Sequence, residues 1–263
     1  IEMIISVGGG SVIDMSKIIK SLYLNPSNAE EIAKGLKQVN DPKIPMISIP
    51  TTSGSGSEST HFAVVYVNDE KYSIANNCLK PDEVILDGTL TLSSSKYQKT
   101  CSALDALSQS IESAWAVNST HESQSISFKA LKKCFENFNA YISSDDVQIA
   151  QNILVGANLA GQAINISKTT SAHAWSYAFT KRHEIPHGHA VWLTLPKIFE
   201  IYSKSTEDKI ADPRGHEHLL KTINTIKDTL RIKNDTTIEN QLKDFLKSAD
   251  IKFDLINDLN LSL

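Results

Sequence analysis

The sequence predicts an α/β fold in its first third and an all-helical fold in the remainder. Two observations support this division. Before about residue 92, short β-branched segments alternate with glycine turns and a helical pattern, which is typical of an open, mostly parallel sheet. Beyond it, proline and glycine thin out and apolar residues recur at helical spacing. We therefore expect an α/β domain at 1–92 and an all-helical domain at 93–263.

The α/β part begins with an apolar, β-branched strand at 1–7 that we expect to be buried. It runs into a glycine turn and an amphipathic helix at 12–24, and this order of strand, turn and helix is the repeating unit of an α/β sheet. Further strands are predicted at 45–50, 62–67, 73–75 and 83–86. Because no loop precedes the first strand, the chain opens in mid-fold. We expect the α/β part to be incomplete, with its upstream strands missing.

The helical part begins after the serines at 93–95, which form an N-cap cluster. Apolar residues at helical spacing then predict three long helices, followed by shorter ones. The long helices are expected at 103–117, 123–141 and 145–166, and the shorter ones at 198–203, 216–230 and 238–248.

Composition excludes several classes of function. The 263 residues include 26 lysines and arginines against 30 acidic residues, for a net charge of −4, so the chain lacks the basic surface of a nucleic-acid-binding protein. No apolar run approaches the roughly 20 residues that span a membrane, and no leader opens the sequence. Three cysteines without a CxxC pair do not predict a disulfide framework, so we expect a cytoplasmic protein.

Two loops follow predicted strands. Gly8, Gly9 and Gly10 lack a Cβ, so their backbone N–H groups can approach a phosphate at the start of the next helix, where Ser11 adds a hydroxyl. The alternative is an ordinary tight turn. The Thr- and Ser-rich loop at 51–57 follows the second strand, and ligands of open parallel sheets bind beyond the strands' carboxyl ends. The two loops are thus expected to line one groove, unless the second is a flexible linker.

A carboxylate, an amide and two imidazoles form a candidate metal site. Asp105 and Gln109 are four residues apart in a helical segment, so they share a face. His173 and His187 follow, the second within Pro-His-Gly-His. Two imidazoles and a carboxylate are typical ligands of zinc or iron, with an amide oxygen as a weak fourth. The chain has eight histidines, so each can instead be an ordinary surface or core residue.

Four segments resemble the iron-dependent (group III) alcohol dehydrogenase superfamily. The Gly-Gly-Gly-Ser-Val-Ile-Asp run at 8–14 and the loop at 49–58 are similar to its two nucleotide loops. The Leu-Asp-Ala-Leu run at 104–107 is similar to its metal-binding helix, and Pro-His-Gly at 186–188 to its last metal ligand. Order and spacing agree over most of the chain. The resemblance implies a dehydroquinate-synthase-like fold, with the site in the cleft between a nucleotide-binding α/β domain and a helical domain.

The resemblance also implies ligands for two cofactors. Asp105, His173 and His187 match ligands of a divalent iron or zinc ion, and Gln109 stands where the iron enzymes have a fourth, histidine ligand. Residues matching the groove for NAD(H) or NADP(H) are Gly9, Gly10, Ser11, Asp14, Thr51, Thr52, Ser55 and Lys71.

Two departures from the family pattern affect the chemistry. An amide is a poorer ligand than imidazole, so Gln109 predicts weaker metal binding or a preference for zinc. Where many members have a histidine that relays a proton, this chain has Tyr177. The proton is therefore expected to come from solvent, from a ribose hydroxyl of the nucleotide or from a nearby side chain, with Tyr177 and His183 as the candidate residues.

The runs around Asp105, at 118–120, 168–170 and 185–189, resemble the phosphonoacetaldehyde reductase branch, which forms 2-hydroxyethylphosphonate. A dianionic substrate requires cations and hydroxyls near the metal. The expected substrate contacts are Lys168, Thr169, Thr170, Lys181 and Arg182, although Lys181 and Arg182 can equally form a solvated loop.

The rival interpretations are a glycerol-type dehydrogenase, a dehydroquinate-synthase-like enzyme and a catalytically silent fragment. The expected partner is a small aldehyde or alcohol, with neither nucleic acid nor membrane, and the family implies a homodimer.

Overall fold

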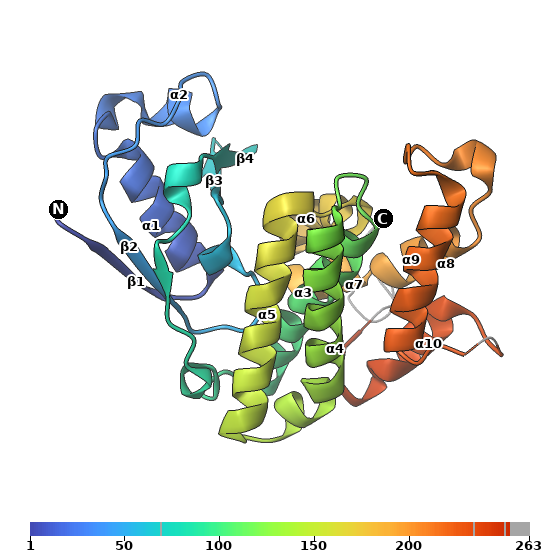
Figure 1. Cartoon of the computed structure of the whole chain (residues 1–263). Coiled ribbons are helices and arrows are strands. Elements are labelled where there is room, and N and C mark those ends of the chain that lie inside the picture. Colours follow the sequence, from blue (N-terminus) through green and yellow to red (C-terminus); the bar gives the residue numbers. More distant parts are fainter. Residues whose placement is uncertain (69, 234, 250, 253–263) are drawn as a thin grey trace.

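The structure is a computed structural model that describes residues 1–68, 70–233, 235–249 and 251–252. Figure 1 shows a sheet-containing N-terminal part beside a larger helical part. Strands β1 (Ile4–Gly8), β2 (Met46–Pro50) and β5 (Glu83–Val84) form a parallel sheet in the order β1-β2-β5. Gly8 lies opposite Pro50, so the loops after both strands emerge at the same edge.

Helix α1 (Gly10–Leu22) and the short α2 (Ala29–Ala33) lie in the crossover between β1 and β2. An antiparallel hairpin, β3 (Phe62–Val67) and β4 (Glu70–Ala75), follows β2. Apolar side chains from these elements form a small core beside the sheet, made of Ile18, Ile32, Ala33, Ala63, Ile74 and Leu79. The hairpin is thereby fixed against α1, which places its far end toward the helical part.

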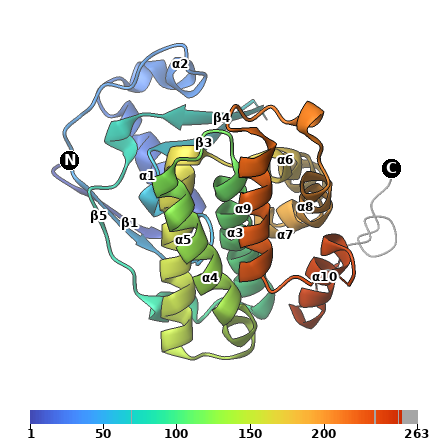
Figure 2. The same cartoon turned by 45° about the vertical axis from the view of Figure 1, so that its right-hand side comes forward.

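Helix α3 (Lys96–Trp115) is the centre of the helical part, because every residue from Lys99 to Trp115 is buried. Ser95 caps it by accepting a hydrogen bond from the Gln98 N–H at 3.2 Å. Helices α4 (His121–Ser143) and α5 (Val147–Ser167) pack beside α3 and each other (Figure 2). The remaining helices are α6 (Ser171–His183), α7 (His187–Trp192), α8 (Leu195–Ser203), α9 (Gly215–Thr229) and α10 (Ile238–Phe245).

The sheet-containing part is held against α5. The Asn165 Oδ1 atom accepts the backbone N–H of His61 at 2.8 Å, and Asn158 donates to the Ser59 hydroxyl at 2.6 Å. Gly56, with a φ of 61°, lies against Gly161, where an added Cβ would come 2.5 Å from the Gly56 carbonyl oxygen. The two glycines therefore allow the loop after β2 to approach the α5 backbone closely.

The predicted strands and most of the predicted helices are confirmed, with two kinds of difference. The strand at 1–7 is not buried: Ile5 and Val7 are 61% and 52% exposed, because α1 covers only the face of β1 that carries Ser6. Helices α2, α6 and α7 were not expected. Helices α2 and α7 are too short to show an apolar stripe, and of α6 only Ala172, His173 and Ser176 are buried.

Within the described residues, none of the helices combines the length and apolarity required to cross a bilayer.

Candidate metal centre and the loops beside it

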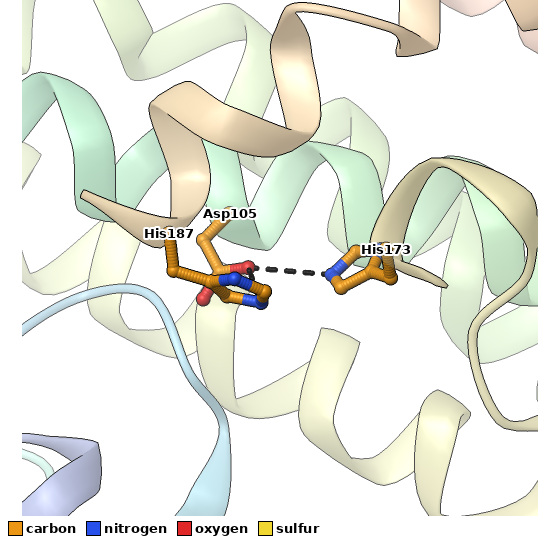
Figure 3. Close-up of side chains that lie close together, drawn as sticks. All are labelled: Asp105, His173 and His187. Carbon is orange, nitrogen blue, oxygen red and sulfur yellow. Dashed lines mark ion pairs between the residues drawn. The ribbon is translucent and has the colours of Figure 1, made fainter. Parts of the chain in front are cut away.

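Asp105, His173 and His187 converge although they come from three helices. Figure 3 shows the three side chains pointing toward one another from α3, the first turn of α6 and the start of α7. Their ligand atoms all lie within 4.8 Å of one another. The Asp105 Oδ1 atom lies 3.4 Å from His173 Nε2 and 3.9 Å from His187 Nε2. These separations exceed good hydrogen bonds, but ligands around one tetrahedral zinc ion are separated by about 3–3.5 Å.

Several donor atoms at this point lack a hydrogen-bond partner in the described part of the chain. Asp105 Oδ1, Gln109 Oε1 and His173 Nε2 are buried, and none of the three has a hydrogen-bond partner among the described residues. Buried polar atoms without partners are rare and costly, so such a cluster calls for a group that the protein itself does not provide. Oxygen and imidazole nitrogen donors at this spacing fit a divalent cation such as zinc or iron.

Gly188 explains how α7 reaches α3. A Cβ at this position would clash with the Cys101 carbonyl oxygen, and would also lie 2.9 Å from the backbone nitrogen of Asp105. Only glycine permits this approach of the two backbones. The Pro-His-Gly run therefore places His187 directly over the turn of α3 that carries Asp105.

The electrostatics of the triad favour positive charge between the carboxylates. Burial opposes a charged His173, but Glu112 and Asp105 outweigh it and raise the pKa of His173 to about 9. Burial lowers the pKa of His187 to about 4, despite the attraction of Asp105. Burial also opposes ionisation of Asp105, yet the two imidazoles keep its pKa below the usual range. In the metal-free protein, protonated His173 thus provides the positive charge that a bound metal ion would otherwise provide.

Glu112 is a buried part of the site that the sequence interpretation missed. It lies seven residues after Asp105, two helical turns along the same face of α3, and its carboxylate contacts the Nδ1 atom of His173. That spacing was the available signal. The carboxylate also accepts the Thr170 hydroxyl at 2.5 Å, while Thr170 accepts the Trp115 indole N–H at 2.9 Å.

Tyr177 and Lys71 lie against the triad. The ring of Tyr177, on α6, is parallel to that of His187 with 5.7 Å between centroids, and the Lys71 ammonium lies 2.9 Å from the Tyr177 centroid. Burial lowers the pKa of Lys71 to about 8, against the attraction of Asp14 and Asp105. Burial raises the pKa of Tyr177 to about 12, so its phenol is protonated near neutral pH. Strand β4 therefore brings a cation from the N-terminal part to the site.

Other predicted site residues lie farther from the triad. His183 ends α6, ten residues after His173, which is roughly 15 Å along a helix axis. Lys181 and Arg182 are exposed at that same end, and Lys168 is exposed at the end of α5. The Thr170 hydroxyl contacts Glu112 and Trp115, and Thr169 is half-buried beside it.

The two predicted nucleotide loops adjoin at the carboxyl edge of the sheet. The Thr51 N–H donates to the Gly8 carbonyl oxygen at 3.0 Å. A Cβ added to Gly10 would lie 2.6 Å from Ser55 Oγ, and one added to Gly9 would lie 3.3 Å from Thr52 Oγ1. The loops thus face each other at the start of α1, where a helix N-terminus favours an anion.

Two links connect these loops to their surroundings. Gln109 Nε2 donates to the Ser55 carbonyl oxygen at 3.2 Å, so the second loop is tied to α3 one turn from Asp105. Asp14 accepts the Ser57 hydroxyl at 2.5 Å and the Val64 N–H at 3.0 Å. Its carboxylate therefore faces the loop and the hairpin.

Comparisons with known proteins agree with this geometry. The sequence model described as "Iron-containing alcohol dehydrogenase" matches residues 1–88, and "Fe-containing alcohol dehydrogenase family, C-terminal" matches residues 99–258. The chain is 31% identical over 201 residues to "Probable alcohol dehydrogenase EutG" of Escherichia coli strain K12, covering 75% of this chain and 50% of that protein. It is 27% identical over 235 residues to "Phosphonoacetaldehyde reductase" of Streptomyces viridochromogenes, covering 86% and 59%.

A solved structure is similar over nearly the whole chain. Sulfoacetaldehyde reductase from Bifidobacterium kashiwanohense, in complex with NAD+, matches with a TM-score of 0.75 and 26% identity, over 96% of this chain and 70% of that one. The chain spans about half the length of the curated relatives it matches.

Proposed function

The chain belongs to the iron-containing alcohol dehydrogenase family, and from this premise we propose that it carries the metal and nucleotide sites of an NAD(P)-linked oxidoreductase acting on CH–OH groups. The convergence of Asp105, His173 and His187 beside the two loops is the observation that carries the proposal. We also propose two domains that meet at about residue 92: the residues before it bind the nucleotide, and the residues after it bind the metal.

Asp105, His173 and His187 would hold a divalent iron or zinc ion, with the Gln109 Oε1 atom as the fourth ligand. The partnerless buried atoms of this set support the assignment. When bound, such an ion supplies a Lewis acid that stabilises negative charge on the substrate oxygen, and the nicotinamide supplies or accepts a hydride.

The nucleotide would lie across the two loops. Gly9 and Gly10 carry no Cβ that would meet Thr52 and Ser55, so the two loops approach closely at the α1 N-terminus, where a pyrophosphate would bind and Ser11 would add a hydroxyl. The opposite wall would consist of Thr51, Thr52 and Ser55. Asp14 holds that wall in place through Ser57, and Lys71 closes the groove on the side of the metal centre.

Tyr177 is the preferred proton donor. Its phenol is protonated near neutral pH and its ring is parallel to that of His187, which supports a place beside the ligand set. It would deliver a proton to the alcohol oxygen during aldehyde reduction, with the Lys71 ammonium held over its ring. His183 remains the second candidate, although it lies at the far end of α6.

The substrate we propose is phosphonoacetaldehyde, reduced to 2-hydroxyethylphosphonate. Two relatives, phosphonoacetaldehyde reductase and sulfoacetaldehyde reductase, are named for short aldehydes that carry an acidic group. Lys71 brings positive charge to the triad. Of the predicted contacts for the acidic group, Lys168, Thr169 and Thr170 precede α6 on the side of His173, whereas Lys181 and Arg182 lie at the exposed far end of α6.

A substrate panel tests the proposal. The purified protein, stripped and reloaded with zinc or ferrous iron, is assayed for NADH or NADPH oxidation with phosphonoacetaldehyde, sulfoacetaldehyde and acetaldehyde, and for glycerol oxidation. We expect phosphonoacetaldehyde to give the highest kcat/KM, and Asp105→Ala to abolish turnover. Preference for glycerol would instead identify a glycerol-type dehydrogenase. If Asp105→Ala turned over substrate at the wild-type rate, the metal would have no role in the reaction.

A further inference from the structure

Glu112 is a fully buried carboxylate at the edge of the metal centre. Its side chain is 0% exposed, in the middle of the core helix α3. The carboxylate accepts the Thr170 hydroxyl at 2.5 Å and the Ala172 N–H at 2.8 Å through Oε1. Through Oε2 it accepts the His173 N–H at 3.3 Å and contacts the ring Nδ1 of the same residue.

These contacts fix which ring nitrogen of His173 faces the triad. With a proton on Nδ1 donated to Glu112, the neutral imidazole keeps its free electron pair on Nε2. Nε2 is the atom that lies 3.4 Å from Asp105 Oδ1 and has no hydrogen-bond partner among the described residues. The carboxylate therefore turns the donor atom of His173 toward Asp105.

The same carboxylate holds the start of α6. Thr170, the residue before this helix, makes no side-chain capping bond, and the N–H groups of Ala172 and His173 are bonded instead by Glu112 from α3. One side chain thus fixes both the backbone that carries His173 and the orientation of its ring.

We propose that Glu112 is a positioning residue that sets metal affinity by fixing the tautomer and the orientation of His173. The inference rests on the metal centre of the proposed function. Outer partners of this kind typically change metal affinity by about 10- to 100-fold.

Glu112→Gln is the decisive variant. Glutamine has nearly the same shape as glutamate, but only one of its two terminal atoms accepts hydrogen bonds, whereas both oxygens of the carboxylate do. In either orientation, the amide places its NH2 group against a donor: Nδ1–H of His173 in one, and N–H of Ala172 in the other. We expect the dissociation constant for Zn2+, measured by competition with a chromogenic chelator, to rise about 10- to 100-fold.

Glu200→Gln is the matched control. Glu200 is also buried and accepts the N–H that starts a helix, that of Ile238 at 2.7 Å, but it lies on α8 and pairs with Lys204. We expect its Zn2+ dissociation constant to equal that of the wild type. If Glu112 only caps α6, Glu112→Gln will lower the melting temperature of the metal-free protein and leave Zn2+ affinity unchanged, and the inference is then wrong.

Nitrogen NMR of histidine-labelled, zinc-loaded wild-type protein tests the tautomer even if Glu112→Gln does not fold. We expect His173, assigned through its backbone, to carry a hydrogen-bonded proton on Nδ1. A proton on Nε2, with zinc on Nδ1, would overturn the inference. Wild-type protein that binds no Zn2+ at all would overturn the metal centre itself, whereas equal affinity in wild type and Glu112→Gln overturns only the role of Glu112.

Discussion

The candidate metal centre contains buried polar atoms without hydrogen-bond partners among the described residues. Among the residues that the structure describes, Asp105 Oδ1, His173 Nε2 and Gln109 Oε1 are buried and have no hydrogen-bond partner, although the first two lie 3.4 Å apart. Each buried polar atom without a hydrogen bond lowers the stability of the fold, so such atoms are rare. Their presence at one point therefore suggests that function requires them. The chemistry of each donor therefore decides how strongly a cation is held.

Gln109→His tests the fourth ligand position. Imidazole is a better ligand than an amide for zinc and iron, so we expect the variant to lower the metal dissociation constant roughly tenfold. The bond from Gln109 Nε2 to the Ser55 carbonyl oxygen would be lost in the exchange. Competition with a chelator measures the affinity, and an unchanged value would place Gln109 outside the coordination shell.

His173 predicts a pH dependence of the metal-free protein. Glu112 and Asp105 overcome burial and raise its pKa from 6.5 to about 9, so the folded state holds a proton that the unfolded chain releases. This contribution to the free energy of unfolding is complete below pH 6.5 and is lost as pH rises through 9. We expect the difference in urea stability between wild type and His173→Gln to shrink over that range. A difference that grows with pH would contradict the assignment.

At the residue scale, the sequence predicted the ligands better than their supports. The convergence of Asp105, His173 and His187 was expected because family motifs surround Asp105 and His187, and His173 matches the remaining ligand by position. Glu112 was missed, since its role depends on the packing of α3 against the start of α6, and that packing does not follow from local spacing. The contacts of Thr170 with Glu112 and Trp115 were missed for the same reason.

At the scale of elements, α7 packs closely on α3 because Gly188 has no side chain. Gly188 lets the start of α7 lie on the α3 backbone near Cys101 and Asp105. The ligand His187 is therefore carried by close backbone packing and not by a long helix, since α7 spans only His187–Trp192.

Gly188→Ala tests this packing. The added methyl group would push α7 away from α3, and overpacking of this kind costs about 1–3 kcal/mol. We expect lower thermal stability together with weaker zinc binding. Gly35→Ala is the control, because Gly35 has a φ of 72° with no atom near its would-be Cβ. It should cost only backbone strain and leave zinc affinity unchanged, and a Gly188→Ala protein with normal zinc affinity would refute the argument.

Elements were predictable where a pattern was long enough. Helices α3, α4 and α5 each run for 20 residues or more, so their apolar spacing is read reliably. Helix α6 was not predicted because only Ala172, His173 and Ser176 of its residues are buried, so it carries no apolar stripe. Strand β1 was predicted, but its exposure was not, because periodicity identifies an apolar face without identifying what covers it.

At the scale of the whole molecule, the candidate metal centre brings together α3, α6 and α7, which are separated in the sequence by α4 and α5. Asp105 and the two histidines lie on opposite sides of the α4–α5 pair in sequence, so all of α3 to α7 must be folded before the ligands meet. A ligand that binds only the folded state stabilises it by mass action.

Metal removal should therefore destabilise the protein as a whole. At a zinc concentration of about 100 times the dissociation constant, the free energy of unfolding should rise by about 2.7 kcal/mol. Thermal melts with zinc and after chelation measure this difference. We expect no such difference in Asp105→Ala, and equal melting temperatures for wild type in both conditions would show that zinc does not bind the folded triad.

The amide of Gln109 has a consequence for how two cofactors behave together. It ties the Ser55 loop, which faces the glycine turn, to the helix that carries Asp105. In the proposed enzyme, a dinucleotide that displaced the loop would act through this bond on the residues around Asp105. Reciprocity then requires equal effects in both directions, so occupancy of either site would change affinity at the other by the same factor.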